Sequence, residues 1–357
     1  MSRGEDSGAL VVTPRQADSR WYRRAVEEEL DASRALDDRQ LAGLRINRPE
    51  ILAYRARMMG GSDAMPGYAD WTSQALASFG PRRSCLSLGS GVGRVESYLL
   101  STGFACSFDA VELSPVANRS AAARDERIGA LSGDLNFVQL PDRRYDFILC
   151  HGILHHLINL EHVLHQIDRA LTPDGVLLVY EYVGENRWQF ARERCQHLEK
   201  TVPGSRVRVP PRHRIKGFES VRSGDLLRLL QHQFGERCER RAQFGGLYFP
   251  FVVGAPSSGM KHLEAVLRAD EDASMSGAVQ PCYHMGVYRK TGNPAARATP
   301  WTDAELRARL CPDSPIGCRA VDGLRRSPAG PALRRVRRAV RGMAATVRGA
   351  HQTEAAA

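Results

Sequence analysis

The chain has 357 residues, of which 43% are hydrophobic and 25% charged, a composition typical of a folded globular protein. Its longest apolar stretch, residues 244–256, is too short to cross a membrane and contains glycine and proline, so a membrane-spanning protein is not expected. The net charge is +10, but nine arginines and one aspartate in residues 319–348 account for +8 of it, leaving +2 elsewhere. We therefore do not expect the main part of the chain to bind nucleic acid.

The N-terminus and the cysteines both favour a cytoplasmic protein. The first ten residues lack the apolar core of a secretion signal and include Glu5 and Asp6. None of the eight cysteines forms a C-x-x-C pair, and most lie in apolar runs, as reduced buried thiols do. Cys311 and Cys318 lie in a loop with proline and glycine. Their spacing is compatible with a disulfide or with half of a zinc site.

Residues 1–18 are polar and show no periodicity, so we expect a flexible arm. Residues 19–80 are expected to form N-terminal helices, because apolar residues recur there at helical spacing. Three such helices are expected, at residues 21–44, 49–59 and 68–79.

The main domain is expected over residues 81–290, where short apolar runs alternate with helical patterns. The expected strands are residues 84–88, 104–113, 145–150 and 175–182. The expected helices between them are residues 94–101, 116–127 and 160–170. This alternation predicts an α/β fold with a parallel sheet covered by helices on both faces.

After residue 184 the alternation ends. Residues 185–217 are rich in arginine, histidine and proline and are expected to form an insertion or lid. A helix is expected over residues 223–234, with Ser223 as its N-cap. Residues 240–253 and 281–290 are expected to be two closing strands.

Residues 291–357 form a tail rich in proline, alanine and arginine. Its residues 331–348 have the pattern of a basic amphipathic helix, which would touch an anionic membrane or an acidic partner weakly. A disordered solubilising tail explains the same pattern.

A glycine-rich turn follows the first expected strand, where residues 86–94 read LSLGSGVGR. Glycines at alternate positions let the backbone approach a ligand closely, and the following helix N-terminus adds free N–H groups. A dinucleotide-binding loop would have the spacing G-x-G-x-x-G, but Arg94 occupies the place of its last glycine. An NAD-dependent oxidoreductase is therefore disfavoured.

The spacing G-x-G-x-G resembles motif I of class I S-adenosylmethionine (SAM)-dependent methyltransferases. The segment VELSP at residues 111–115 is similar to the end of that family's second strand, which puts Glu112 in the place of the ribose-binding acid. A carboxylate suits this task because it can accept two hydrogen bonds from a vicinal diol. The segment GDL at residues 133–135 resembles the adenine-edge motif, with Asp134 accepting from the exocyclic amine and Leu135 offering a backbone N–H.

Later segments extend the resemblance over roughly residues 80–290: YDFILC (145–150), LHHL (154–157), RALTPDG (169–175) and YHMGVYRK (283–290). The resemblance implies a Rossmann-like seven-stranded, mostly parallel sheet with an antiparallel last strand, and SAM as the cofactor. The residues it implies for cofactor binding are Leu88, Gly89, Ser90, Gly91, Gly93, Glu112, Leu113, Asp134, Leu135 and His151.

Two further points come from the resemblance. The segment EYVGENRWQF at residues 181–190 looks like a bacterial subgroup that often modifies sugars or natural products, which by analogy favours a small-molecule or glycan acceptor. The family usually has an acid two residues before the first glycine, where this chain has Ser87. A serine brings no charge, so another carboxylate is expected to compensate or the methionine end of SAM is bound more weakly.

Methyl transfer from a sulfonium needs alignment and exclusion of water, and a hydroxyl acceptor also benefits from a base. The acceptor side should lie beyond the carboxyl ends of the strands that precede His151 and include Glu181. The candidates for catalysis are His155, as general base, with His151 and Glu181. His155 or His156 would alternatively only pack within the loop, and Glu181 would be a strand-end carboxylate paired with Arg187 or Arg192. No metal site is expected, because His151 and His155 span a strand-to-turn junction and not one helix.

The sequence thus predicts a SAM-dependent methyltransferase, directed to a hydroxyl of a small molecule or glycan. The alternative is a non-catalytic SAM-fold module acting through its basic tail, which the serine at position 87 keeps open. The sequence does not indicate an oligomeric state.

Overall fold

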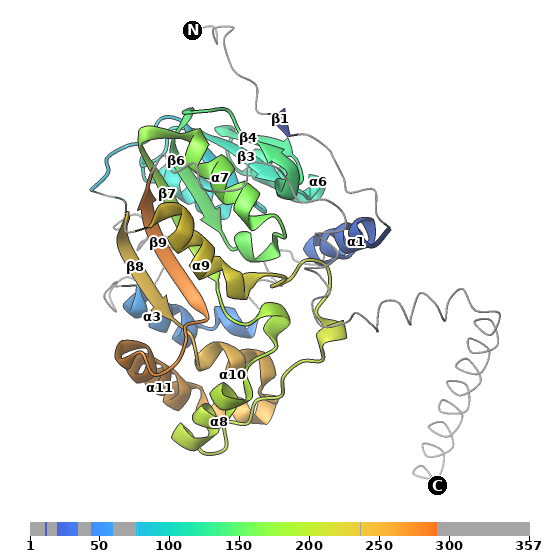
Figure 1. Ribbon diagram of the computed structural model, residues 1–357, viewed down its shortest axis with the longest axis vertical. Helices are drawn as coiled ribbons and strands as arrows, with labels where there is room; N and C mark the ends of the chain where they lie inside the picture. The colour runs from blue at the N-terminus through green and yellow to red at the C-terminus, as the bar shows by residue number, and fades with distance from the viewer. Residues whose placement is uncertain are drawn as a thin grey trace, which may run out of the picture. The chain divides into compact units, whose positions relative to one another are not determined.

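The computed structural model describes residues 11–12, 20–34, 44–59, 76, 78–235 and 237–290 (Figure 1). The chain divides into two compact units, residues 1–303 and 304–357, and every described residue belongs to the first. The tail at 291–357, with its expected basic helix, lies outside the described residues, as does most of the expected helix 68–79 and most of the arm 1–18.

A seven-stranded sheet forms the centre of the domain, in the order β4-β3-β2-β6-β7-β9-β8. Its strands are β2 (Cys85–Leu88), β3 (Phe108–Glu112), β4 (Ile128–Ser132), β6 (Tyr145–His151), β7 (Leu171–Tyr182), β8 (Cys238–Phe244) and β9 (Tyr283–Arg289). Only β9 runs against the others in this sheet, because it pairs antiparallel with both β7 and β8. The mostly parallel Rossmann-like sheet with an antiparallel last strand is confirmed.

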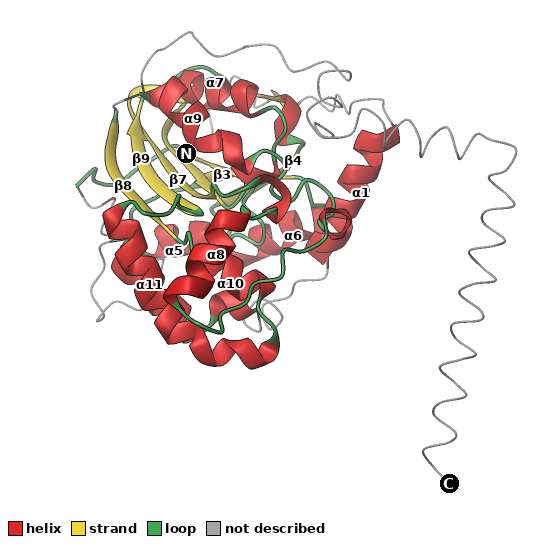
Figure 2. Cartoon of the chain, turned by 60° about the horizontal axis from the view of Figure 1, so that its bottom comes forward, coloured by secondary structure: helices red, strands yellow, loops and turns green. Residues whose placement is uncertain are grey.

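The helices cover both faces of this sheet. They are α1 (Arg20–Arg34), α3 (Pro49–Met58), α5 (Arg94–Ser101), α6 (Pro115–Arg124), α7 (Leu160–Ala170), α8 (Arg192–Thr201), α9 (Ser223–Phe234), α10 (Tyr248–Gly254) and α11 (Leu263–Ser276). Figure 2 shows α7 and α9 on one side of the strands and α5 on the other. No helix among the described residues is long and apolar enough to cross a membrane.

Alternate residues of the central strands point to opposite faces of the sheet and pack in two separate hydrophobic cores. Leu86 and Leu88 of β2 pack with α7 and α9, whereas Cys85 faces the core that includes α3, α5, α10 and α11. This alternation follows from the two-residue period of a strand. Because both faces are buried, the central strands read as continuous apolar runs, such as FILC in β6.

Several expected elements need correction. Residues 240–253, expected to be one strand, are the end of strand β8 followed by helix α10. Helix α10 is apolar and buried almost throughout, so its sequence shows no helical spacing of apolar and polar residues. Ser223 is the first residue of α9 and not its N-cap, which is Arg222 without a side-chain capping bond. The expected insertion 185–217 contains helix α8, and within the expected arm Val11–Val12 pair as β1 with β5 (Val138–Gln139).

Candidate functional site

The glycine-rich turn between β2 and α5 has the backbone that its sequence predicts. Gly89, Gly91 and Gly93 have φ angles of 70°, 53° and 75°, a region that other residues rarely adopt. A Cβ on Gly89 would lie 2.2 Å from the side chain of Ile153, and one on Gly93 would lie 2.9 Å from Ala121. At Gly91, apart from its two chain neighbours, no atom of the described residues lies within 4 Å of the Cβ position, which leaves space for a ligand there.

Glu112, at the end of β3, is hydrogen-bonded to this turn. Its Oε2 accepts from the backbone N–H of Gly91 (3.0 Å), and its Oε1 accepts from the N–H of Ser114 (2.8 Å). The carboxylate is thereby fixed beside the glycine turn, with lone pairs left over for a diol. This is the position that the sequence predicts for the ribose-binding acid.

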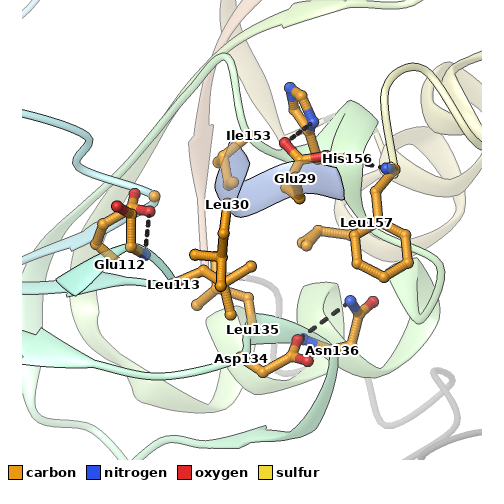
Figure 3. Close-up of a pocket in the computed structure, with 13 residues that line it drawn as sticks. Glu29, Leu30, Glu112, Leu113, Asp134, Leu135, Asn136, Ile153, His156 and Leu157 are labelled. Carbon is orange, nitrogen blue, oxygen red and sulfur yellow. Dashed lines mark hydrogen bonds and ion pairs between the residues drawn. The ribbon is translucent and has the colours of Figure 1, made fainter. Parts of the chain in front are cut away.

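A cavity lies where β2, β3 and β6 end and is closed on one side by α1 (Figure 3). It is lined by Glu29, Leu30, Gly89, Glu112, Leu113, Ser114, Asp134, Leu135, Asn136, Ile153, His156, Leu157 and Phe218. Its volume is about 70 Å³, below the roughly 300 Å³ of even a small ligand pocket. Leu30 of α1 lies between Glu112 and Asn136 in Figure 3 and narrows the space.

Helix α1 also contacts the predicted adenine-binding acid. The hydroxyl of Tyr22, a buried residue of α1, donates to Oδ2 of Asp134 at 2.7 Å. Oδ1 of Asp134 accepts from the backbone N–H of Asn136 at 3.0 Å. Burial raises the pKa of Asp134, and these hydrogen bonds oppose the shift. A ligand amine would therefore share this carboxylate with Tyr22.

Ser87 is paired with a carboxylate that the sequence analysis did not identify. Its hydroxyl donates to Oε1 of Glu96, from helix α5, at 2.5 Å. Both side chains are buried, and burial raises the pKa of Glu96 to about 7. A carboxyl group is thus present beneath the glycine turn, although it comes from α5 and not from β2.

Glu181, at the end of β7, holds the histidine-containing turn after β6. Its side chain is fully buried, and Oε1 accepts from the N–H groups of Ile153 and Leu154, each at 2.7 Å. Oε2 lies 2.7 Å from Nδ1 of His155. Its partners are thus the turn and a histidine, and not Arg187, whose guanidinium donates to backbone carbonyls. This contact fixes the His155 ring and leaves its Nε2 for another group.

The two neighbouring imidazoles share a second carboxylate. Nε2 of His155 and Nε2 of His156 lie 3.7 Å and 3.8 Å from the carboxylate of Glu219. Nδ1 of His156 forms a 2.9 Å ion pair with Glu29 of α1. Burial lowers the pKa of His156, but Glu219 and Glu29 raise it more strongly, to about 9.

His151 lies in a different environment. Its ring stacks on Tyr180 with the ring centroids 5.2 Å apart. Burial lowers its pKa to about 4, against the attraction of Glu181, so its ring is neutral near pH 7. Arg55 of α3 is close enough to lower this pKa further and donates to the hydroxyl of Tyr248 at 2.8 Å.

The structure brings some of the sequence-predicted residues to the cavity and leaves others beside it. Those that line it are Gly89, Glu112, Leu113, Asp134 and Leu135. Those that do not are Leu88, Ser90, Gly91, Gly93, His151, His155 and Glu181. The hydroxyl of Ser90 is buried with no hydrogen-bond partner in the described part of the chain, so it is available to a ligand at the turn.

Sequence reasoning missed the contributions of α1 and of distant loops. These residues are Tyr22, Glu29, Leu30, Asn136 and Phe218. The helical periodicity of α1 predicts a buried face but not what that face covers. The contact between Tyr22 and Asp134 cannot be predicted from local sequence, because the two residues are 112 positions apart in the chain.

Comparison with known proteins gives one family match: residues 86–179 match the model of a methyltransferase domain. A search of curated protein sequences finds no match. Similar solved structures include a sarcosine dimethylglycine methyltransferase from Galdieria sulphuraria, named as putative, which is 18% identical with a TM-score of 0.41 over 62% of this chain and 85% of that one.

Two further structures are similar at the same level. A SAM-dependent methyltransferase from Mesorhizobium loti is 19% identical, with a TM-score of 0.38 over 62% of this chain and 98% of that one. Phosphoethanolamine N-methyltransferase 2 from Haemonchus contortus, in complex with SAM, is 12% identical, with a TM-score of 0.39 over 71% of this chain and 60% of that one.

The matched segment contains the glycine turn, Glu112, Asp134 and the histidine turn. The donor set fits SAM: open space over Gly91, an unpartnered Ser90 hydroxyl, and two carboxylates at the ends of neighbouring strands. Residues 86–179 match a methyltransferase domain, and this match supports a SAM-dependent methyltransferase with SAM as its cofactor.

Proposed function

We propose that this enzyme transfers the methyl group of SAM to a hydroxyl of a small-molecule or glycan acceptor. The observation that carries the proposal is the single cavity that joins Glu112 and Asp134 to the histidine turn through His156. A nucleoside held by the two acids would place its reactive end near this turn, at the carboxyl edge of the sheet, where ligands of such folds bind.

Different residues would bind the cofactor and the acceptor. Glu112 would hold the ribose and Asp134 the adenine, after α1 has moved enough to admit them. SAM supplies a methyl group on a positively charged sulfur, which leaves as a neutral thioether, so the protein mainly has to align the groups and exclude water. The side chains of Leu30 and Phe218, which line the cavity, provide an apolar cover that would exclude water.

A hydroxyl acceptor, unlike a thioether, must lose a proton as it is methylated. Glu181 orients His155 through Nδ1, so the lone pair of Nε2 is held toward Glu219 and available for that proton. His151 would line the acceptor side as a neutral ring. This arrangement supports an oxygen-directed reaction.

We further propose a cytoplasmic location, with the basic tail making at most weak contact with an anionic membrane or acidic partner. The six cysteines of the described residues are all free, which is usual in a reducing compartment.

The proposed cofactor site is tested by isothermal titration of SAM into Glu112→Ala. Loss of a charged hydrogen-bond partner costs about 1.5–3 kcal/mol, so the affinity for SAM should fall by roughly 10- to 100-fold. Glu126→Ala, which removes an exposed glutamate before β4, is the matched control and should bind normally. Equal affinity in Glu112→Ala and Glu126→Ala would place SAM elsewhere.

The alternative function is a non-catalytic module that binds SAM and acts through its tail. Incubation with methyl-labelled SAM and a panel of sugar and phenolic acceptors decides between the two. Transfer of label to a hydroxyl supports the proposal, and transfer to a nitrogen would move it to another acceptor class. SAM binding without label transfer to any acceptor in the panel would favour the module.

A further inference from the structure

We propose that Nε2 of His155, Nε2 of His156 and the carboxylate of Glu219 form a binding site for a divalent transition-metal ion such as Zn²⁺. The three ligand atoms lie within 4.8 Å of one another. Two imidazoles and one carboxylate are a donor set that such ions use in proteins, with the remaining positions left for water or substrate.

The spacing of the ligand atoms suits a cation between them. The 3.7 Å and 3.8 Å separations between the imidazole nitrogens and Glu219 are too long for hydrogen bonds. Ligands at about 2.1 Å from a common ion lie roughly 3–4 Å from each other. The rings of His155 and His156 have their centroids 4.2 Å apart, so both can reach one ion with small rotations.

Both imidazoles also have the outer partners that metal-ligating histidines usually have. Nδ1 of His155 contacts Glu181 at 2.7 Å, and Nδ1 of His156 contacts Glu29 at 2.9 Å. The hydrogen bond to Glu181 fixes the tautomer of His155 that exposes Nε2, and a carboxylate beside the far nitrogen of either ring makes Nε2 a stronger donor to a metal. Each imidazole therefore has a carboxylate beside its Nδ1, and both rings turn Nε2 toward the shared carboxylate of Glu219.

The charge of the cluster favours an added cation. Three carboxylates, Glu29, Glu181 and Glu219, surround the two imidazoles, and their ion pairs within the described part of the chain are all made with these rings. The guanidinium of Arg187 is also nearby, since it donates to the carbonyl of Glu219 at 3.2 Å. With neutral rings, as metal ligands require, these three carboxylates and one guanidinium leave a formal charge of −2, which a divalent ion would compensate.

The surrounding backbone holds the third ligand in place. The hydroxyl of Ser220 donates to Glu219 at 2.6 Å, and Ser220 has a φ of 49°, which is uncommon for a residue other than glycine. The N–H of Val221 donates to the carbonyl of His155 at 3.1 Å, which joins the two ligand segments directly. Strained backbone of this kind is often found at functional sites.

A cation here would act on the acceptor, in a role that rests on the proposed methyl transfer. His156 lines the cofactor cavity, so a hydroxyl on an open position of the ion would lie at the edge of that cavity. The ion lowers the pKa of the hydroxyl, which releases its proton to solvent, and the oxygen bonds the methyl carbon as the carbon–sulfur bond breaks. His155 would then be a ligand instead of the base, and the two roles exclude each other.

Titration of Zn²⁺ into the full-length protein, without SAM or acceptor, tests the site itself. We expect one more bound Zn²⁺ in the wild type than in Glu219→Gln, because an amide replaces the charged ligand. Both proteins keep the same thiols, so zinc binding by cysteines cancels in the comparison. His197→Gln, which changes an exposed histidine of α8, is the matched control and should bind as the wild type does.

A second variant guards against a folding defect. Glu29→Gln leaves all three ligands in place but removes the partner of His156, so it should weaken Zn²⁺ binding by roughly 10- to 100-fold. The proposal is overturned if Zn²⁺ binds equally to the wild type and to folded Glu219→Gln, since that ion would be adventitious. Failure of methyl transfer with intact Zn²⁺ binding would instead refute the proposed function and leave the metal site standing.

Activity after treatment with a chelator separates the two roles of His155. A metal-dependent enzyme loses activity and regains it with added Zn²⁺ or Mn²⁺. Full activity in metal-free protein would show that the ion has no part in the reaction, and the proposed role of His155 as the base would then stand.

Discussion

Ser87 and Glu96 show how a missing acid can be replaced from a neighbouring element. In the methyltransferase pattern an acid precedes the glycine turn on the strand itself, whereas here the strand carries a serine that donates to a carboxyl from α5. The exchange became possible because Glu96 faces the underside of β2 from the first turn of α5. A sequence motif that specifies the residue at one position cannot detect that Glu96 replaces the acid from another element.

Glu96 should make the stability of the protein depend on pH. Its folded-state pKa is raised from 4.5 to about 7, so the folded state binds a proton more tightly than the unfolded chain. The free energy of unfolding should therefore fall as pH rises from about 4.5 to 7 and become level above that range. At about 1.4 kcal/mol for each pKa unit, the loss is at most about 3–4 kcal/mol.

Urea unfolding of the wild type and Glu96→Gln at pH 5 and pH 8 measures this contribution. The amide does not titrate, so the variant should lose less stability than the wild type between the two values. Glu126→Gln, at an exposed position, should behave as the wild type does. An equal loss in all three proteins would mean that Glu96 is ionised in the folded state at pH 5.

At the scale of elements, α1 covers the cavity that we propose for the cofactor. Its Tyr22 is bonded to Asp134, its Glu29 pairs with His156, and its Leu30 occupies the space beside Glu112. A cavity of about 70 Å³ cannot hold a nucleoside cofactor, so the proposed SAM site requires a shift of α1 before SAM binds. Only molecules in which α1 is open would then bind SAM. The apparent affinity is the intrinsic affinity multiplied by the fraction of such molecules.

Leu30→Ala should therefore bind SAM several-fold more tightly and faster than the wild type, because less of α1 has to be displaced. Stopped-flow binding and isothermal titration measure both effects. Glu27→Ala, which shortens an exposed side chain of the same helix, should change neither. Weaker binding by Leu30→Ala would show instead that Leu30 packs on the bound cofactor.

The elements that the sequence predicted well are those with a clear period and a clear boundary. Helix α5 starts directly after the glycine turn, and α7 and α9 show apolar residues at helical spacing, so their expected bounds agree with the structure. Helix α10 was mistaken for a strand because YFPFVVG is apolar throughout and is buried against its surroundings. Strand β4 was not predicted, since its short sequence, IGALS, includes a glycine and half-exposed residues.

The predictable part of the candidate site is the part that follows parallel strands. Glu112 could be placed because it ends a strand beside the glycine turn, and sheet geometry brings such ends together. The contributions of Glu29 and Glu219 could not, because no periodicity or spacing relates them to the histidine turn. They reach it through the packing of α1 and of the segment before α9.

At the scale of the whole molecule, the proposed cofactor site connects segments that are far apart in the chain. The cavity takes residues from α1, from the ends of β2 and β3, from the turn after β6 and from Phe218. A ligand that contacts all of these segments favours the folded state over the unfolded one. Its binding should therefore raise the stability of the whole domain and not only order one loop.

Thermal unfolding with and without SAM tests this coupling and the identity of the cofactor together. At a SAM concentration of 100 times Kd the folded state gains about 2.7 kcal/mol, which should raise Tm by roughly 5 °C. NAD⁺ at the same concentration should leave Tm unchanged, because Arg94 starts α5 where a dinucleotide-binding turn needs a glycine. A shift with NAD⁺ that equals the shift with SAM would mean that the cavity selects adenosine alone. In that case the glycine turn would not discriminate between a sulfonium and a pyrophosphate.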